Sequence, residues 1–223
     1  MKYYVNDLYG FLRELAANND RDWFRANKSR YDDLRALWLA DIGRMIDAMS
    51  VWDPALTSLT AKRAAYRIYR DTRFSPDKTP YKTFFSAAMN APGSQSGFYI
   101  QIGPDPHQWA GLFAGIWCPE APLLKKLRRA IVDNIEEWES IVNSPEIVSN
   151  FEITTSDSLK TVPRGWPKDH PHAGWLRMKD YGLQARNVGP EFFLDPSWPE
   201  RSAELLSLTK PFVDFLNYSA AEE

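Results

Sequence analysis

The sequence predicts an α+β fold, in which an antiparallel sheet of about four or more strands packs with N-terminal and C-terminal helices. Apolar residues recur at helical spacing before residue 50 and after residue 119, whereas short segments between residues 62 and 118 alternate as strands do. The connectors between these segments are shorter than the roughly dozen residues that a parallel crossover needs, so neighbouring strands should be antiparallel. Runs of strands flanked by runs of helices are typical of α+β proteins.

Two helices are predicted in the first 50 residues. Apolar residues from Leu8 to Leu15 follow i, i+3, i+4, i+7 spacing, and the polar stretch 18–20 ends this helix. A longer helix is predicted from about Asp22 to Ser50, and its apolar stripe is interpreted as core. Gly43 inside this helix costs about 1 kcal/mol relative to alanine, so we expect a close packing contact there.

Strand patterns occupy the middle of the chain. The fourth of them is rich in small residues, which indicates a close backbone approach or a bulge. The predicted strands are Ala64–Arg70, Lys82–Asn90, Gly97–Gly103 and Trp109–Trp117.

The helical period returns after Pro119. Segments 123–131 and 135–142 each carry an apolar face, and the glutamates of the second should face solvent. Residues 154–174 are rich in Pro, Gly, Ser and Thr and are expected to form a loop, followed by a short helix near 175–179. A last helix is predicted from about Pro199, and Pro211 should kink or split it.

The composition is that of an ordinary globular protein of 223 residues, with 44% hydrophobic residues, 27 Lys+Arg and 29 Asp+Glu. We expect a single domain over 1–223, with N-terminal helices in 6–50, the central sheet in 62–118, and C-terminal helices with a Pro-rich loop in 119–223. The lone cysteine, Cys118, is expected to be a small core residue, and it fits a reducing compartment. With a polar N-terminus and no long apolar run, the expected location is cytoplasmic, away from membranes.

Charge is unevenly distributed along the chain. Residues 61–82 carry seven Lys or Arg and two Asp, a local net charge of +5, whereas residues 131–158 carry seven acids and no cation. The whole chain has a net charge of only -2, so its overall field cannot steer a polyanion. Anion binding is therefore expected at a local site.

The segment Tyr66–Lys82 is the first candidate site. Its cations recur about every three residues along a predicted strand that becomes a loop, and guanidinium groups bind phosphate or carboxylate oxygens in bidentate pairs. Alternatively, Asp71 and Asp77 tie this loop together through arginine pairs, and its charges are structural. The candidate ligand-binding residues here are Arg67, Tyr69, Arg70, Arg73, Lys78 and Lys82.

A second candidate site lies in the rigid, Pro-rich stretch 161–172. Arg164 and Lys168 add two cations, and Asp169 and His170 offer a carboxylate and an imidazole. Adjacent residues rarely orient one another for acid–base catalysis, and three His with one Cys are too few for a zinc site without carboxylates, so we expect no metal and no cofactor.

Three function classes stay open. The preferred class is binding of a phosphate- or carboxylate-bearing ligand in a cationic pocket formed by the 66–82 hairpin and the 163–170 loop. The second is an enzyme acting on a phosphorylated or nucleic-acid substrate, with Asp71, Asp77, Asp169 or His170 as weak acid–base candidates. The third is an interaction protein whose Arg/Asp loop is purely structural. A small anionic partner is expected, nucleic acid has weaker support, and the oligomeric state is open.

From about Phe11 to Lys179, the chain resembles an uncharacterised family, domain of unknown function 2461. The shared motifs are Asn19-Asp20-Arg21-Asp22-Trp23-Phe24, the run RIYRDTRFSPDKTPYKT from Arg67 to Thr83, and PRGWPKDHP from Pro163 to Pro171. Trp166 departs from the Phe or Tyr often found at its position. The resemblance implies a free-standing cytosolic protein of about this length whose two cationic loops belong together, and it implies no activity.

Overall fold

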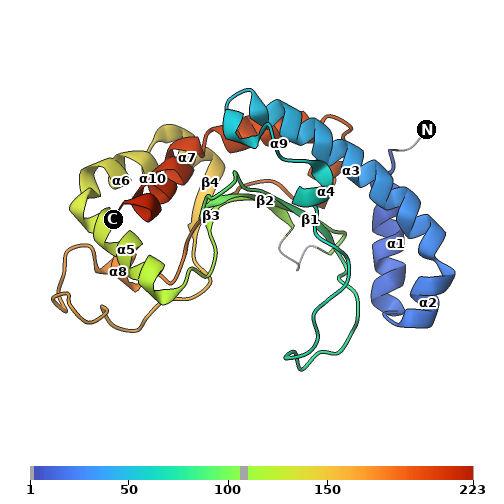
Figure 1. Ribbon diagram of the computed structural model, residues 1–223, viewed down its shortest axis with the longest axis horizontal. Coiled ribbons are helices and arrows are strands. Elements are labelled where there is room, and N and C mark those ends of the chain that lie inside the picture. Colours follow the sequence, from blue (N-terminus) through green and yellow to red (C-terminus); the bar gives the residue numbers. More distant parts are fainter. Residues whose placement is uncertain (1–2, 106–109, 223) are drawn as a thin grey trace. The chain divides into compact units, whose positions relative to one another are not determined.

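The computed structural model describes residues 3–105 and 110–222 and confirms the α+β class (Figure 1). Two short 3-10 helices, η1 (Pro54–Leu56) and η2 (Pro190–Leu194), accompany the α-helices. The α-helices are α1 (Val5–Ala17), α2 (Arg21–Ala26), α3 (Lys28–Ser50), α4 (Ala61–Ala64), α5 (Ala121–Asp133), α6 (Ile135–Val142), α7 (Pro145–Asn150), α8 (Ala173–Arg177), α9 (Trp198–Ser207) and α10 (Lys210–Ala221). In the described part of the chain, no helix has the length and apolar content needed to cross a bilayer.

Five strands form one antiparallel sheet in the order β1-β2-β3-β5-β4. Phe113 of β3 pairs with Gln184 of β5, and Phe151 of β4 pairs with Ala185 on the other side of β5. The last two strands were not predicted. The strands are β1 (Phe85–Met89), β2 (Gly97–Ile102), β3 (Gly111–Ile116), β4 (Phe151–Thr154) and β5 (Tyr181–Ala185).

Three of the four predicted strands are confirmed as β1, β2 and β3, although Trp109, the expected start of the last, lies outside the described residues. The prediction of a regular strand over Ala64–Arg70 is wrong. Ala64 ends helix α4, and the residues after it run extended with only isolated bridges at Ala65 and Tyr69. The alternating pattern identified an extended segment, but not a continuous ladder.

The chain divides into two compact units, and each is described by itself. The first comprises Met1–Met89, Tyr99–Leu112 and Val188–Glu204, and the second comprises Asn90–Phe98, Phe113–Asn187 and Leu205–Glu223. The expectation of a single domain stays a prediction.

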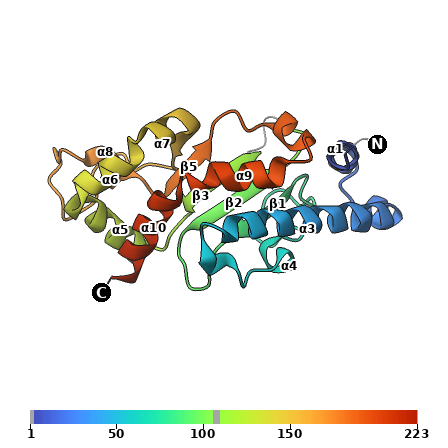
Figure 2. The same cartoon turned by 90° about the horizontal axis from the view of Figure 1, so that it is seen from above.

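An aromatic core holds the first unit together. Trp38 of α3 is 1% exposed and stacks on Trp198 at the start of α9, with ring centroids 5.7 Å apart. Trp38 also contacts Phe85 of β1 edge-on at 5.9 Å. Figure 2 shows α3 and α9 side by side, as this ring contact requires. Rings of this size bury large apolar areas and fix α3 against β1.

The helix predicted from about Asp22 to Ser50 is two helices, α2 and α3, that meet at Asn27. The Asn27 side-chain amide donates to the Trp23 carbonyl at 2.9 Å. Asparagine competes with the helical backbone in this way and favours helix ends. The hydrophobic period continues across the break, so it could not reveal the junction.

Trp138 is the centre of the second unit. It is fully buried in α6 and contacts the rings of Trp175, Tyr181, Phe212 and Phe215 at centroid distances of 5.2–5.7 Å. These partners come from α8, β5 and α10.

The split predicted at Pro211 is confirmed. α9 ends at Ser207, α10 begins at Lys210, and Pro211 lies in the first turn of α10, where its missing N–H leaves no helical hydrogen bond unmade.

Two glycines test the packing of these units. We expect Gly115→Ala to lower the free energy of unfolding by at least about 3 kcal/mol, because φ is +130° there and a Cβ would lie 2.2 Å from the Tyr181 carbonyl oxygen. Gly43→Ala is the matched control. The close contact expected at Gly43 is wrong, since a Cβ there meets nothing within 4 Å. This change in α3 should raise stability by about 0.5–1 kcal/mol. Chemical denaturation measures the free energy of unfolding of both variants. Equal changes in the two would contradict the close packing at Gly115.

Candidate functional site

The hairpin that carries the first predicted site changes register halfway along its length. The Tyr66 amide donates to the Ser86 carbonyl at 2.9 Å, and the Lys82 amide donates to the Ile68 carbonyl at 2.8 Å. One residue on the outgoing side is thus matched by three residues on the returning side. Such a bulge bends the strand and re-aims the side chains beside it.

A small hollow opens beside this bulge, in the first unit. Arg67, the single unmatched residue, and Lys82 both line it, and Arg35 reaches it from α3. None of the described residues that line the hollow is acidic. Its remaining walls are mostly aromatic or apolar, formed by Tyr31, Trp38, Tyr66, Ile68, Phe84, Phe85 and Ser86.

Arg67 and Lys82 have no compensating charge inside the hollow. Within residues 3–105 and 110–222, neither side chain forms a salt bridge or donates a side-chain hydrogen bond. Burial lowers the pKa of Lys82, and the positive charge of Arg67 lowers it further. The Lys82 Nζ instead lies 5.1 Å from the centroid of the Tyr66 ring and 6.0 Å from that of Phe84.

The other cations of the hairpin are engaged within its own loop. The Arg70 guanidinium donates to Asp77 and Thr79, and Arg73 pairs with Asp71, with Nε 3.0 Å from Oδ1. The Lys78 ammonium donates to a backbone carbonyl at 2.9 Å. These contacts agree with the structural alternative for the loop, and ligand binding by Arg70, Arg73 and Lys78 stays a prediction.

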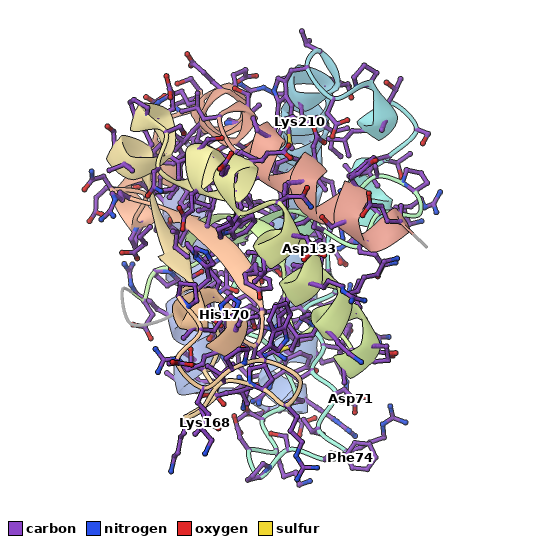
Figure 3. The ribbon with its side chains drawn as sticks, turned by 90° about the vertical axis from the view of Figure 1, so that its left-hand side faces the viewer. Asp71, Phe74, Asp133, Lys168, His170 and Lys210 are labelled. Atoms are coloured by element: carbon purple, nitrogen blue, oxygen red, sulfur yellow. The ribbon has the colours of Figure 1, made fainter. Side chains whose placement is uncertain are left out.

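Both aspartates of the loop are held in the ionised form. Hydrogen bonds from the Thr79 amide, then from Arg70, lower the pKa of Asp77 to about 2, and Arg73 lowers the pKa of Asp71. A carboxylate this acidic is a weak base at neutral pH. Their observed contacts order the loop, whose end carries Asp71 and the 93% exposed Phe74 (Figure 3).

The base of the hairpin is fixed by residues that the sequence did not single out as functional. The Asn19 side chain accepts from the Tyr81 amide at 3.1 Å and donates to the Tyr81 carbonyl at 3.0 Å. The ring of Phe24 stacks on Tyr81 at 4.1 Å and contacts Tyr69 at 6.0 Å. Tyr69, a predicted ligand contact, therefore packs against α2.

Arg35 and Phe84 were also absent from the predicted site, and Tyr66, which begins the predicted segment, was not among its predicted contacts. The spacing of Tyr31, Arg35 and Trp38 gave a usable signal, because i, i+4, i+7 places all three on one face of α3. No pattern identified Phe84, whose place depends on the bulge.

The second predicted segment belongs to the second unit. The Trp166 and His170 rings meet edge-on at 5.2 Å, and the His170 Nδ1 accepts from the His172 amide at 3.1 Å. Arg164, Lys168 and Asp169 are exposed and form no salt bridge with the described residues. Figure 3 shows Lys168 at the outer end of this loop. Its meeting with the hairpin stays a prediction.

Cys118 is exposed, and the expectation of a core cysteine is wrong. The chain leaves β3 at Ile116 and turns at Cys118 with φ of +46°, which accompanies its exposure. Its Sγ lies 4.0 Å from Oδ2 of Asp180, which is 1% exposed. Among the described residues, no group of three or more His, Cys, Asp or Glu could hold a metal ion.

The sequence pattern of a family described as a conserved hypothetical protein, DUF2461, matches residues 7–215. The chain belongs to the DUF2461 family. The matched region contains the hairpin, its Asn19 anchor and the 163–170 loop. No curated protein and no solved structure matches the chain. Since the DUF2461 description names no activity, the function has to be argued from the side chains.

The hydrogen bonds that Asp77 accepts from Thr79 and Arg70 at the loop end can be tested by titration. We expect the Thr79 amide resonance to titrate with a midpoint near pH 2, because that amide donates to the Asp77 carboxylate. Arg70→Ala should raise the midpoint toward 3.8, the ordinary value of an aspartate. Arg73→Ala is the control, since Arg73 pairs with Asp71, and it should leave the midpoint unchanged. A midpoint near 3.8 in the parent protein would contradict these hydrogen bonds to Asp77.

Proposed function

We propose that the hollow beside the hairpin binds a phosphate- or carboxylate-bearing ligand, with Arg67 and Lys82 as its principal contacts and Arg35 at its wall. One observation carries the proposal. Two cations face a hollow whose described lining contains no acid, while every other cation of the hairpin segment 66–82 has a partner within the loop.

The energetics of this arrangement favour the binding of an anion. Two like charges held together disfavour one another, and burial of Lys82 adds to that cost. A bound phosphate or carboxylate would offset both effects, since it accepts hydrogen bonds from a guanidinium and an ammonium at once. Ligand binding by Arg164 and Lys168 of the 163–170 loop stays a prediction.

The loop end supports a different role, the structural alternative. Its charges are matched by Arg70–Asp77 and Arg73–Asp71, so little cationic surface is left there for an extended polyanion. A small ligand at the base of the hairpin fits this distribution better than a nucleic-acid strand, which needs several phosphate contacts.

Binding of inorganic phosphate tests the proposal by calorimetry. Arg67→Ala should weaken phosphate binding about 10-fold or more, because a charge-assisted hydrogen bond contributes about 1.5–3 kcal/mol. Affinity should also fall as ionic strength rises. Arg73→Ala is the matched control, since it removes an exposed arginine already paired with Asp71, and it should change affinity less than twofold. Equal binding by the parent and both variants would refute the site.

The stability of Lys82→Met gives a second test. The pKa of Lys82 lies below its ordinary value in the folded protein, so the protonated lysine disfavours folding at neutral pH. That penalty fades as pH rises through the folded pKa toward 10.5. Without phosphate, Lys82→Met should therefore leave the free energy of unfolding at pH 7 unchanged or raise it, while phosphate binding is lost. A loss of more than about 1 kcal/mol in urea denaturation would indicate a structural lysine instead.

A further inference from the structure

The aromatic residues beside the cations specify what the anion is attached to. We infer that the ligand is an aryl anion, a phosphate or carboxylate joined closely to a flat aromatic ring, and that Tyr66 holds this ring. The inference rests on the proposed function and names the ligand class of the same hollow.

The first support is the exposure of Tyr66. This residue lines the hollow, yet it is 52% exposed. The planes of the Tyr66 and Tyr99 rings are tilted, and their centroids are 6.3 Å apart. By comparison, the ring of Phe24 stacks on Tyr81 with a centroid distance of 4.1 Å. A large ring that lies at the rim of a cationic hollow and retains half its surface can accept a second ring.

The second support is the distance from the ring to the cation. The Lys82 Nζ lies 5.1 Å from the Tyr66 centroid and 6.0 Å from the Phe84 centroid. An anion hydrogen-bonded to this ammonium is about 2.8 Å from it, so an anion bound on the Tyr66 side of the ammonium would have its attached group within reach of that ring. A ring attached directly to the anion would therefore contact Tyr66, whereas inorganic phosphate would leave it bare.

The third support is the composition of the walls. Besides Tyr66 and Phe84, the buried side chains of Trp38, Ile68 and Phe85 line the hollow. These walls offer apolar and aromatic contacts, and few groups that could hydrogen-bond a sugar or peptide. Such a site favours a planar apolar group with one charged end.

Three probes of equal charge type test the inference: inorganic phosphate, methyl phosphate and phenyl phosphate, each measured by calorimetry. The parent protein should bind phenyl phosphate about 3- to 10-fold more tightly than methyl phosphate. In Tyr66→Leu this ratio should fall to about 1. A ratio cancels any effect of Tyr66 on Lys82 itself. Phe74→Ala is the matched control, since it removes a fully exposed ring at the loop end, and it should retain the parent ratio.

The outcomes separate this inference from the proposed function. If the parent protein binds phenyl phosphate and methyl phosphate equally well, and Arg67→Ala still abolishes methyl phosphate binding, the aryl ligand is overturned and the anion site is retained. A high ratio that survives Tyr66→Leu, or that falls in Phe74→Ala, places the ring elsewhere and also overturns it. If no phosphate probe binds, or if binding ignores Arg67→Ala, the proposed function fails and this inference fails with it.

Discussion

Backbone hydrogen-bond pairing in the hairpin is the constraint on which the candidate site depends. The Tyr66–Ser86 and Lys82–Ile68 hydrogen bonds are both made, although the two sides contribute different numbers of residues between them. The surplus on the returning side must leave the ladder, because buried backbone groups have to stay paired. The hollow lies at this surplus, and Arg67 and Lys82 both line it with no acid in its described lining.

The hairpin divides its charges between two tasks. At its end, arginines and aspartates pair with one another and hold the loop in one shape, which agrees with the structural alternative for that part. At its base, Asn19 and Phe24 hold Tyr81, while Arg67 and Lys82 line a hollow whose described lining contains no acid. The loop end pairs its charges although they are largely exposed, whereas the partly buried Lys82 lines a hollow whose described lining contains no acid.

The sequence predicted the elements whose side-chain period is regular and missed those decided by tertiary pairing. The helices α1, α5 and α6 and the strands β1 to β3 were found from periodicity. The break at Asn27 was missed because one asparagine interrupts the backbone without disturbing the apolar stripe. Of the three cations that line the hollow, Arg67 and Lys82 were predicted from the sequence and Arg35 was not. The division of the hairpin cations into paired and unpaired groups could not be predicted, because it depends on a register shift between the Tyr66–Ser86 pair and the Ile68–Lys82 pair.

The environment of Lys82 also affects its covalent chemistry. An amine whose pKa is lowered by burial and a neighbouring guanidinium is neutral in a larger fraction of molecules than an ordinary surface lysine at the same pH. The neutral amine is the form that attacks electrophiles. Lys82 should therefore be acylated sooner than the paired Lys78 by reagents that modify amino groups, and an occupied hollow would protect it from that modification.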